Sequence, residues 1–326
     1  MANKTMNLLY EGKAKRIFAD PESTNRVIME FKDSVTAGDG ARKEEFSGKG
    51  IIACDISHLL FEYLGEMGID THYINRLEGP RLLCRRVKII PIEVVCRNIA
   101  AGSFSKRYGI EKGKVFEQPF VEMFLKNDSL HDPLIASTAI VGLGILSRSD
   151  MEFLTRVTLS VNYYLSELLK QHALTLVDFK LEFGKTESDA IVLADELSPD
   201  SMRIWDSDSS SLDKDVFRED KGNLISVYQK MLDIIRMTDS KNIEPRKETA
   251  QVIVEPKKGI KNPTGEVTRK ALIRLGFSEV EDVRAGRVYN VVLKKPITSD
   301  MLNHLNVMSV KLLSNPISER HHVRLE

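Results

Sequence analysis

Charged side chains are concentrated along two short apolar segments between Leu176 and Asp206. Carboxylates brought together by neighbouring strands provide the oxygen ligands that Mg2+ takes, usually together with substrate phosphates. A lysine between such carboxylates could neutralise a phosphoryl oxygen. The charged residues of interest here are Asp178, Lys180, Glu182, Asp195, Glu196, Asp200, Arg203 and Asp206. Their types and spacing predict metal-assisted phosphate chemistry.

Both apolar segments have the pattern of β-strands. Residues 177–183 alternate strictly, which places the three charged side chains of this run on one face and apolar side chains on the other. Residues 190–194 form a second apolar run that ends at Asp195 and Glu196. The alternative is a solvated outer face of an antiparallel pair, where charges alternate because water is there. Spacing alone leaves both interpretations open.

A β-hairpin is predicted over residues 8–18, with its turn at Gly12 and with Lys13 and Lys15 on one strand face. Lysines two residues apart can reach phosphates from the same side, and glycine lets the backbone approach them closely. The Walker pattern G-x-x-x-x-G-K-[ST] is absent from the sequence. An ordinary exposed hairpin would explain the same residues.

A further anion site is predicted where a strand over residues 92–97 ends at Arg97. Small residues follow it and lead to a helix start with Ser103 as a cap, where free N–H groups favour an anion and Arg97 can add a bidentate contact. The alternative is an ordinary helix cap beside a solvated arginine. The glycine-rich segment 36–43, which contains Asp39, precedes a helix predicted over 51–67 and could be only a polar connection.

Composition predicts a globular protein of one to three domains, since the chain has 326 residues, of which 42% are hydrophobic. No apolar run is long enough for a membrane span, and the first residues carry no export signal, so we expect a cytoplasmic protein. The three cysteines, Cys54, Cys84 and Cys96, lie far apart in apolar contexts, which favours buried reduced thiols.

The charge distribution indicates a change of module near the C-terminus. Residues 250–326 hold 13 basic and 8 acidic side chains, whereas the rest of the chain holds 34 and 39. These basic residues are scattered and not grouped with aromatic ones, so we expect no nucleic-acid partner. A helix is predicted over 224–237 and is followed by a polar, proline-bearing segment, which places a domain boundary near 240–249.

Six motifs in this order resemble the family of phosphoribosylaminoimidazole-succinocarboxamide synthase (SAICAR synthetase). The resemblance covers about residues 6–237. The motifs are Tyr-Glu-Gly-Lys-Ala-Lys at 10–15, Arg-Asn-Ile-Ala-Ala-Gly-Ser at 97–103, Lys-Asn-Asp at 126–128, Leu-Val-Asp-Phe-Lys-Leu-Glu-Phe-Gly at 176–184, Asp-Glu-Leu-Ser-Pro-Asp at 195–200 and Leu-Asp-Lys-Asp-Val-Phe-Arg at 212–218. Long ordered motifs rarely arise together by chance, so the resemblance favours a catalytic site over the structural alternatives.

This resemblance implies a two-part α/β (α+β) fold with a nucleotide cleft, and an ATP-dependent ligase that joins carboxyaminoimidazole ribonucleotide to L-aspartate. It implies a catalytic domain over 1–237, with the ATP-binding part at about 1–90, and a linker over 238–249. The implied site assigns Gly12, Lys13 and Lys15 to ATP, Glu182 and Asp195 to Mg2+, Lys180 and Asp178 to the catalytic centre, and Arg97, Ser103, Arg203, Lys126 and Asp39 to substrates.

Residues 250–326 resemble the small PurS subunit of formylglycinamidine ribonucleotide synthase, on the segments 254–266, 275–287 and 313–316. Strands and helices are expected in the order β-α-β-β-α-β, as in a small ferredoxin-like domain, with one or two strands over 280–294. The resemblance implies a module without an active site that forms a homo-oligomer and docks the synthetase and glutaminase subunits. An amino-acid-sensing regulatory domain of similar topology is the alternative.

Two other functions are considered for the main part of the chain. A kinase-like small-molecule phosphotransferase with a C-terminal effector-binding domain would need the same lysines and carboxylates, but would release a phosphate ester. A non-catalytic scaffold would not need these acidic and basic residues. Product analysis distinguishes the first alternative from the ligase, and any turnover excludes the second.

Overall fold

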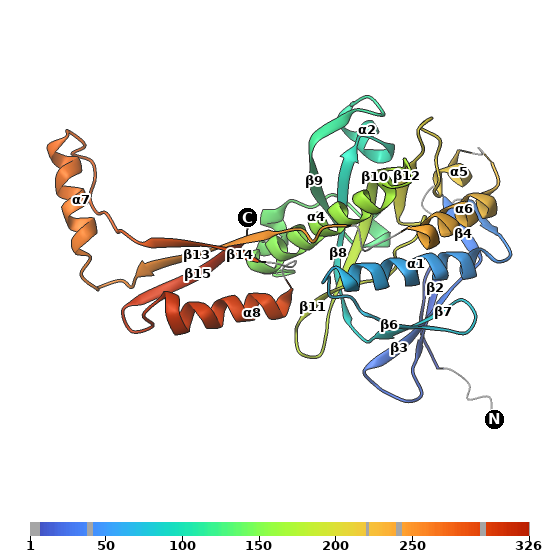
Figure 1. Ribbon diagram of the computed structural model, residues 1–326, viewed down its shortest axis with the longest axis horizontal. Helices are drawn as coiled ribbons and strands as arrows, with labels where there is room; N and C mark the ends of the chain where they lie inside the picture. The colour runs from blue at the N-terminus through green and yellow to red at the C-terminus, as the bar shows by residue number, and fades with distance from the viewer. Residues whose placement is uncertain (1–6, 38–41, 220–221, 239–242, 294–297, 326) are drawn as a thin grey trace. The chain divides into compact units, whose positions relative to one another are not determined.

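The computed structural model describes residues 7–37, 42–219, 222–238, 243–293 and 298–325. Contacts divide the chain into two compact units, Met1–Glu244 and Pro245–Glu326 (Figure 1). Each unit is described by itself. Throughout the described ranges, no helix combines the length and the apolar character that crossing a membrane requires.

The first unit begins with an antiparallel five-stranded sheet in the order β1-β2-β3-β7-β6. Its strands are β1 (Leu8–Glu11), β2 (Lys15–Ala19), β3 (Arg26–Phe31), β6 (Tyr73–Leu77) and β7 (Arg81–Arg85). Helix α1 (Lys49–Glu66) packs on β3, β6 and β7 through a buried face that includes Ala53, Cys54 and Phe61. The predicted hairpin over 8–18 is therefore confirmed as β1 and β2, and α1 matches the helix predicted over 51–67.

A second antiparallel sheet has the order β11-β10-β8-β9, and β12 also pairs with β10. Its strands are β8 (Lys88–Ile99), β9 (Val115–Leu125), β10 (Thr175–Lys185), β11 (Ile191–Ala194) and β12 (Met202–Trp205). Helix α4 (Arg148–Lys170), capped by the Ser147 side chain, packs on β8, β9 and β10. Because β10 has partners on both edges, its charged side chains lie in the middle of the sheet.

Shorter elements complete the first unit. They are the hairpin β4 (Ser34–Ala37) and β5 (Arg42–Glu45), helices α2 (Gly102–Tyr108), α3 (Ser137–Gly142), α5 (Asp215–Arg218) and α6 (Leu224–Met237), and a 3-10 turn at Asp128–Leu130. Helix α6 has the bounds predicted for it and packs on α1. The three cysteines are buried and free, as predicted, and burial raises the pKa of Cys54 and of Cys96 to about 12.

The two sheets of the first unit are joined directly where β11 ends. The segment before β6 runs parallel to β11, through a bridge between Thr71 and Leu193. The His72 N–H donates to the Leu193 carbonyl at 2.7 Å, and the Leu193 N–H donates to the Asp70 carbonyl at 2.9 Å. These bonds fix the β11 end against the first sheet, immediately before Asp195.

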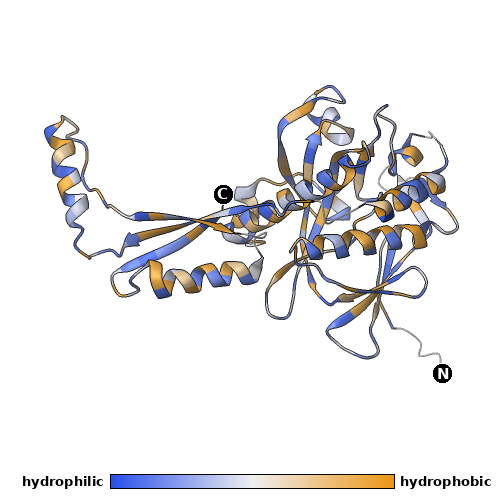
Figure 2. Cartoon of the chain, viewed as in Figure 1, coloured by the Kyte–Doolittle hydropathy of each residue, from blue (hydrophilic) through white to orange (hydrophobic). Residues whose placement is uncertain are grey.

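The second unit contains a three-stranded antiparallel sheet in the order β14-β13-β15. Its elements are β13 (Glu248–Pro256), α7 (Pro263–Arg274), β14 (Arg287–Leu293), α8 (Ser299–Met308), a π-helical turn (Ser309–Leu313) and β15 (Glu319–Leu325). Helix α8 packs along β15, and apolar residues are distributed over both the strands and the helices (Figure 2). Of the one or two strands expected over 280–294, the described residues form one, because residues 281–286 approach β13 and α7 without a strand partner.

Candidate active site

Strand β10 places the three predicted charges in the interior of the second sheet. Asp178 is 4% exposed and Glu182 is 3% exposed, while Phe179 and Phe183 are buried on the opposite face. A solvated outer face would leave the carboxylates in water, so that alternative is wrong. Buried charges need partners, and the identity of these partners defines the site.

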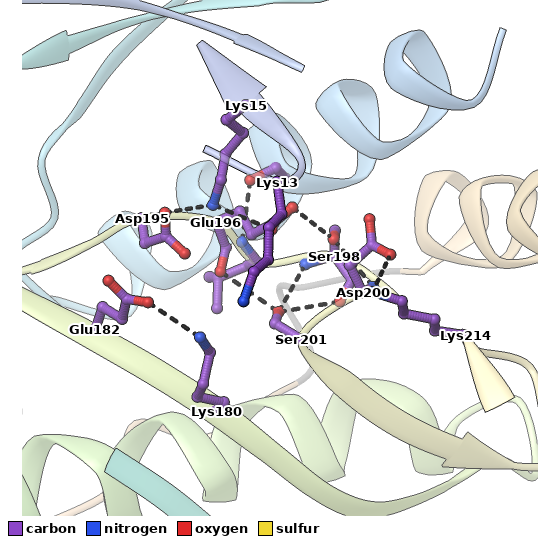
Figure 3. A network of polar contacts seen from close by, with 12 residues as sticks. Lys13, Lys15, Lys180, Glu182, Asp195, Glu196, Ser198, Asp200, Ser201 and Lys214 are labelled. Carbon is purple, nitrogen blue, oxygen red and sulfur yellow. Dashed lines mark hydrogen bonds and ion pairs between the residues drawn. The ribbon is translucent and has the colours of Figure 1, made fainter. Parts of the chain in front are cut away.

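Lys180 and Lys126 converge on Glu182. The Lys180 ammonium donates to Glu182 Oε1 at 3.0 Å (Figure 3). It also donates to Glu93 Oε1 at 2.6 Å. Lys126 pairs with the other oxygen of Glu182. Burial alone would lower the pKa of Lys180, but the neighbouring Glu182, Glu93 and Asp195 carboxylates outweigh it and raise the pKa. Lys180 is therefore a fixed cation between carboxylates.

Lys15 enters the same region from β2 and binds the two carboxylates that follow β11. Its ammonium pairs with Asp195, and it lies 3.0 Å from Glu196 Oε1 (Figure 3). Burial disfavours charge on both partners, yet the attraction raises the pKa of Lys15 and lowers the pKa of Asp195. The site thus holds cations and anions that are ionised together at neutral pH.

The predicted metal ligands fit a magnesium ion shared with a phosphate. The described part of the chain has no group of three or more His, Cys, Asp or Glu side chains placed to hold an ion. Glu182 and Asp195 supply two carboxylates, and the charges of both act on Lys15 and on Lys180. Mg2+ commonly takes one or two protein carboxylates and completes its shell with phosphates and water, so these two residues suit that ion.

The hairpin lysines do not share a strand face, contrary to the prediction. Strand β2 begins at Lys15, and Lys13 lies in the turn, where its ammonium donates to Asp128 at 2.8 Å. The Gly12 N–H donates to the Lys15 carbonyl at 2.9 Å, which closes the turn and leaves Lys13 outside the strand. Both lysines still border the carboxylate cluster (Figure 3). Asp39 lies outside the described residues.

A second network surrounds Arg97 at the end of β8. Its Nε donates to Glu122 at 2.5 Å and its Nη1 to Asp178 at 3.0 Å, with only 3% of the side chain exposed. Arg203 donates to the same Asp178 at 2.8 Å and to Asp215 at 2.7 Å. Arg97 is therefore not a solvated arginine. Burial raises the pKa of Asp178 although both guanidinium groups oppose that change.

Ser103 does not cap the helix, contrary to the prediction. Helix α2 starts at Gly102, and Ala101 occupies the N-cap position without a side-chain hydrogen bond. Gly102 has φ +55°, and a Cβ there would lie 2.5 Å from the Arg203 guanidinium. The absent side chain at Gly102 lets Arg203 approach the backbone, while Ser103 remains exposed beside it.

Asp200, one of the charged residues singled out in the sequence, lies in a buried cluster with three residues that were not predicted to belong to the site. Lys49, which is 1% exposed, pairs with Asp200, and the Tyr228 hydroxyl donates to the same carboxylate at 3.1 Å. Lys214 lies 3.7 Å from it. Burial would raise the pKa of Asp200, but Lys49 and Lys214 lower it to about 2. Lys214 lies in one of the family motifs, whereas the sequence gives no local signal for Lys49 and Tyr228.

Fold and site together define an enzyme whose central strands hold buried lysine and carboxylate pairs suited to phosphate chemistry. The profile of the family described as SAICAR synthetase matches residues 8–235. The chain therefore belongs to the SAICAR synthetase family, whose members are ligases of purine biosynthesis. The profile named PurS, described as phosphoribosylformylglycinamidine (FGAM) synthase, matches residues 249–326, so the chain also carries a PurS-like domain.

Similar proteins support this assignment. The phosphoribosylaminoimidazole-succinocarboxamide synthase of Staphylococcus aureus strain JH9 is 51% identical over 225 residues, which cover 69% of this chain and 96% of that protein. The crystal structure of the synthase from Ehrlichia chaffeensis is similar with a TM-score of 0.69 and 41% identity, and the match covers 71% of this chain and 98% of that chain. A SAICAR synthetase in complex with ADP is similar with a TM-score of 0.67 and 44% identity, and the match covers 70% of this chain and 97% of that chain.

Proposed function

We propose that the chain joins carboxyaminoimidazole ribonucleotide to L-aspartate and converts ATP to ADP and phosphate. The observation that carries this proposal is the partly buried centre of Lys15, Lys180, Glu182 and Asp195, joined by ion pairs, in a chain of this family. A ligase of this type must activate a carboxylate, and phosphoryl transfer depends on positioning and charge neutralisation more than on covalent help from the protein.

In this proposal the reaction has two steps, phosphoryl transfer and amide formation. The ribonucleotide carboxylate attacks the γ-phosphorus of ATP, ADP leaves, and an acyl phosphate forms. The aspartate amine then attacks the acyl carbon, phosphate leaves, and the nitrogen loses a proton as the amide forms. The amine reacts with the acyl phosphate because phosphate is a far better leaving group than the oxide of a free carboxylate.

In this proposal, different residues of the site bind the phosphates of ATP and its Mg2+. Lys13 and Lys15 bind its phosphates, and the Gly12 turn lets the backbone approach them. Glu182 and Asp195 hold Mg2+, which neutralises charge on the phosphoryl oxygens when bound. Lys180 is held by two carboxylates in the free chain, so it is already placed beside the transferred group.

The arginine network binds the ribonucleotide in this proposal. Arg97 and Arg203 are oriented by the shared Asp178 carboxylate, so their planar guanidinium groups are fixed before an anion arrives. Ser103 is exposed next to Arg203 and can donate to the same anion. Lys126 contacts a substrate carboxylate, and Asp39 also binds a substrate in this proposal.

The chain has three parts in our proposal: a catalytic domain at 1–237 with its ATP-binding part at about 1–90, a linker at 238–249 and a PurS-like module at 250–326. The module forms a homo-oligomer and docks the synthetase and glutaminase subunits of formylglycinamidine ribonucleotide synthase. Its many exposed apolar side chains support this assignment, because such surfaces mark interaction sites. Free buried cysteines fit a cytoplasmic enzyme.

The test is turnover by the purified full chain with carboxyaminoimidazole ribonucleotide, ATP and Mg2+, with and without aspartate. We expect the succinocarboxamide to form only when aspartate is present, as measured by the ultraviolet absorbance of the product. One ADP should be released for each amide formed. ADP release with a phosphorylated small molecule and no amide would instead support the kinase-like alternative. Tight amino-acid binding by the PurS-like module would favour the regulatory alternative for residues 250–326.

A further inference from the structure

Asp213 is a fully buried carboxylate in the segment between β12 and α5. Its Oδ2 accepts the Ile204 N–H at 2.8 Å, and its Oδ1 accepts the Asp215 N–H at 2.7 Å. Burial and the nearby Asp215 carboxylate raise the pKa of Asp213 to about 7. A carboxylate here is therefore costly at neutral pH, and its two backbone bonds are the reason for a polar side chain at this position.

Arg203, the residue before Ile204, is held between two carboxylates of different origin. Asp178 lies directly opposite Arg203 in the antiparallel pair of β10 and β12, so strand pairing fixes it. Asp215 accepts the Arg203 Nε–H at 2.7 Å and lies outside this strand pair. It begins α5, a helix of only four residues, which is too short to be stable by itself. The position of Asp215 against Arg203 therefore needs another contact to support it.

The Asp213 carboxylate supplies this support. One of its oxygens binds the backbone of the residue that follows Arg203, and the other binds the backbone of Asp215, which pairs with Arg203. The Leu212 N–H donates to the Ile204 carbonyl at 2.8 Å, so the segment before Asp213 also lies against β12. One planar carboxylate thus links the backbone that carries the guanidinium to the backbone that carries its partner.

The Arg203 side chain remains accessible within this arrangement. It is 18% exposed, whereas its partners Asp178 and Asp215 are 5% and 9% exposed. A group that binds an anion is most effective when supporting hydrogen bonds hold it in place before the anion arrives. The supporting bonds are here on the buried side, which leaves part of the guanidinium open to a ligand.

We propose that Asp213 is a positioning residue that holds the Arg203 guanidinium in place for an anionic group of the ribonucleotide. It acts through Ile204 and Asp215 and does not touch substrate. The inference rests on the proposed function in one respect, the assignment of Arg203 to the ribonucleotide. The alternative is a purely structural role, in which Asp213 holds the segment between β12 and α5 without an effect on Arg203.

The test compares Asp213→Asn with the parent chain at pH 8. The asparagine amide can accept one of the two backbone bonds but presents its own N–H groups to the other donor, so the link is broken with little change in volume. Arginine Nε–H signals in nitrogen-15 NMR, assigned with Arg203→Lys, report on the order of Arg203. We expect the Arg203 Nε–H to exchange with water about tenfold faster in Asp213→Asn, since a buried bond that supports it is lost.

Steady-state kinetics give the second readout. Asp213→Asn should raise the KM for the ribonucleotide by about tenfold and leave the KM for ATP within about twofold, because a small displacement of a binding group weakens the contact that this group makes. Asp33→Asn is the matched control. Asp33 also accepts two backbone N–H bonds with its two oxygens, from Gly48 at 3.2 Å and from Gly50 at 2.8 Å. It should leave the Arg203 signal as in the parent chain.

The outcomes separate this inference from the proposed function. An unchanged Arg203 signal or an unchanged KM for the ribonucleotide in folded Asp213→Asn would overturn it, and so would equal increases in both KM values. A changed Arg203 signal in a chain that forms no succinocarboxamide would reject the ligase and still support the link from Asp213 to Arg203. If Asp213→Asn does not fold, amide hydrogen exchange of the parent chain decides: protection of the Ile204 and Asp215 N–H groups equal to that of β10 supports the inference, and exchange at the rate of an open loop overturns it.

Discussion

The two units of the chain differ in how much charge they bury and how much apolar surface they expose. The first unit buries several charged side chains in its interior, among them Arg97, Asp178 and Glu182. The second unit is much the shorter, yet among the described residues it exposes 12 large apolar side chains, against 13 in the first. Those exposed there are Ile260, Val267, Ile273, Leu275, Phe277, Val288, Val292, Val307, Met308, Val310, Leu312 and Ile317. Its buried hydrophobic residues, as far as the structure describes it, are Ala250, Val252, Val254, Leu293 and Leu305.

This difference indicates that the two units have different roles. Burying a charge is costly, and the cost is recovered only when partners and hydrogen bonds are fixed in place, as they are in a preorganised active site. Exposing apolar surface is also unfavourable, and a second protein surface that covers it removes the cost. The first unit is thus suited to chemistry within itself, and the second unit is suited to association.

The largest expected effect comes from removing the carboxylates of the first unit. Asp195→Asn or Glu182→Gln should lower Mg2+-dependent turnover by about 1000-fold or more, since a preorganised charge at the reacting group is lost. Glu187→Gln is the matched control, because that exposed carboxylate lies between β10 and β11, away from the cluster, and accepts a hydrogen bond from the Asn25 side chain at 2.9 Å. Steady-state assays and circular dichroism together measure activity and fold. Retained turnover in both variants would reject the metal assignment.

Asp200→Asn should have the largest effect on stability. It would leave the Lys49 ammonium buried without its counter-charge, which costs about 3–5 kcal/mol of unfolding free energy. Asp233→Asn on the exposed face of α6 is the control. The measurement is urea unfolding at neutral pH, and a loss as small as that of the control would show that the pair does not stabilise the packing of α1 against the segment between β11 and β12.

The Lys49–Asp200 pair should make the stability of the fold depend on pH. Because the pKa of Asp200 is lowered from 3.8 to about 2, its carboxylate stabilises the fold above pH 3.8, and this contribution disappears as the pH falls toward 2. The difference between the parent and Asp200→Asn should therefore be constant from pH 7 to 5 and should shrink below pH 4. Unfolding curves at pH 7, 5 and 3 would test this.

Arg97→Ala should act mainly on the ribonucleotide. We expect its KM to rise by a factor that corresponds to about 1.5–3 kcal/mol, the value of a charge-assisted contact, while the KM for ATP changes little. Arg97→Lys keeps the charge but loses the planar fork between Glu122 and Asp178, so it should recover only part of the loss. Equal increases in both KM values would mean that Arg97 supports the whole site instead of one substrate.

Local patterns predicted much of this structure. The alternation in β10, the turn at Gly12, the bounds of α6 and most elements of the second unit follow from hydrophobic periodicity and turn residues, which act over a few positions. The family resemblance, carried by long ordered motifs, located Lys15, Lys180, Glu182 and Asp195 in one region before any geometry was known. Three-dimensional contacts then brought them within ion-pair distance.

Features that depend on distant partners could not be predicted in this way. Glu93 and Glu122 lie in strands whose pairing decides that they meet Lys180 and Arg97, and no local pattern encodes that pairing. Ser103 had the residue type of a cap, but Gly102, which Arg203 approaches closely, begins α2, so the cap lies two residues earlier at Ala101. The left-handed backbone at Asp195, with φ 62°, was likewise not predicted from the sequence.

The smallest expected effect on catalysis comes from the second unit. Val288 and Val292 point to the same side of the edge strand β14 and are 56% and 63% exposed. Replacing both with lysine should reduce the molar mass measured by light scattering, because charge on an apolar edge opposes pairing. Turnover should stay within about twofold, as expected for surface changes remote from a site. His322→Lys on the polar edge strand β15 is the control. A fall in mass with unchanged turnover would keep association and chemistry in separate units, whereas a parallel fall in turnover would show that the oligomer supports the active site.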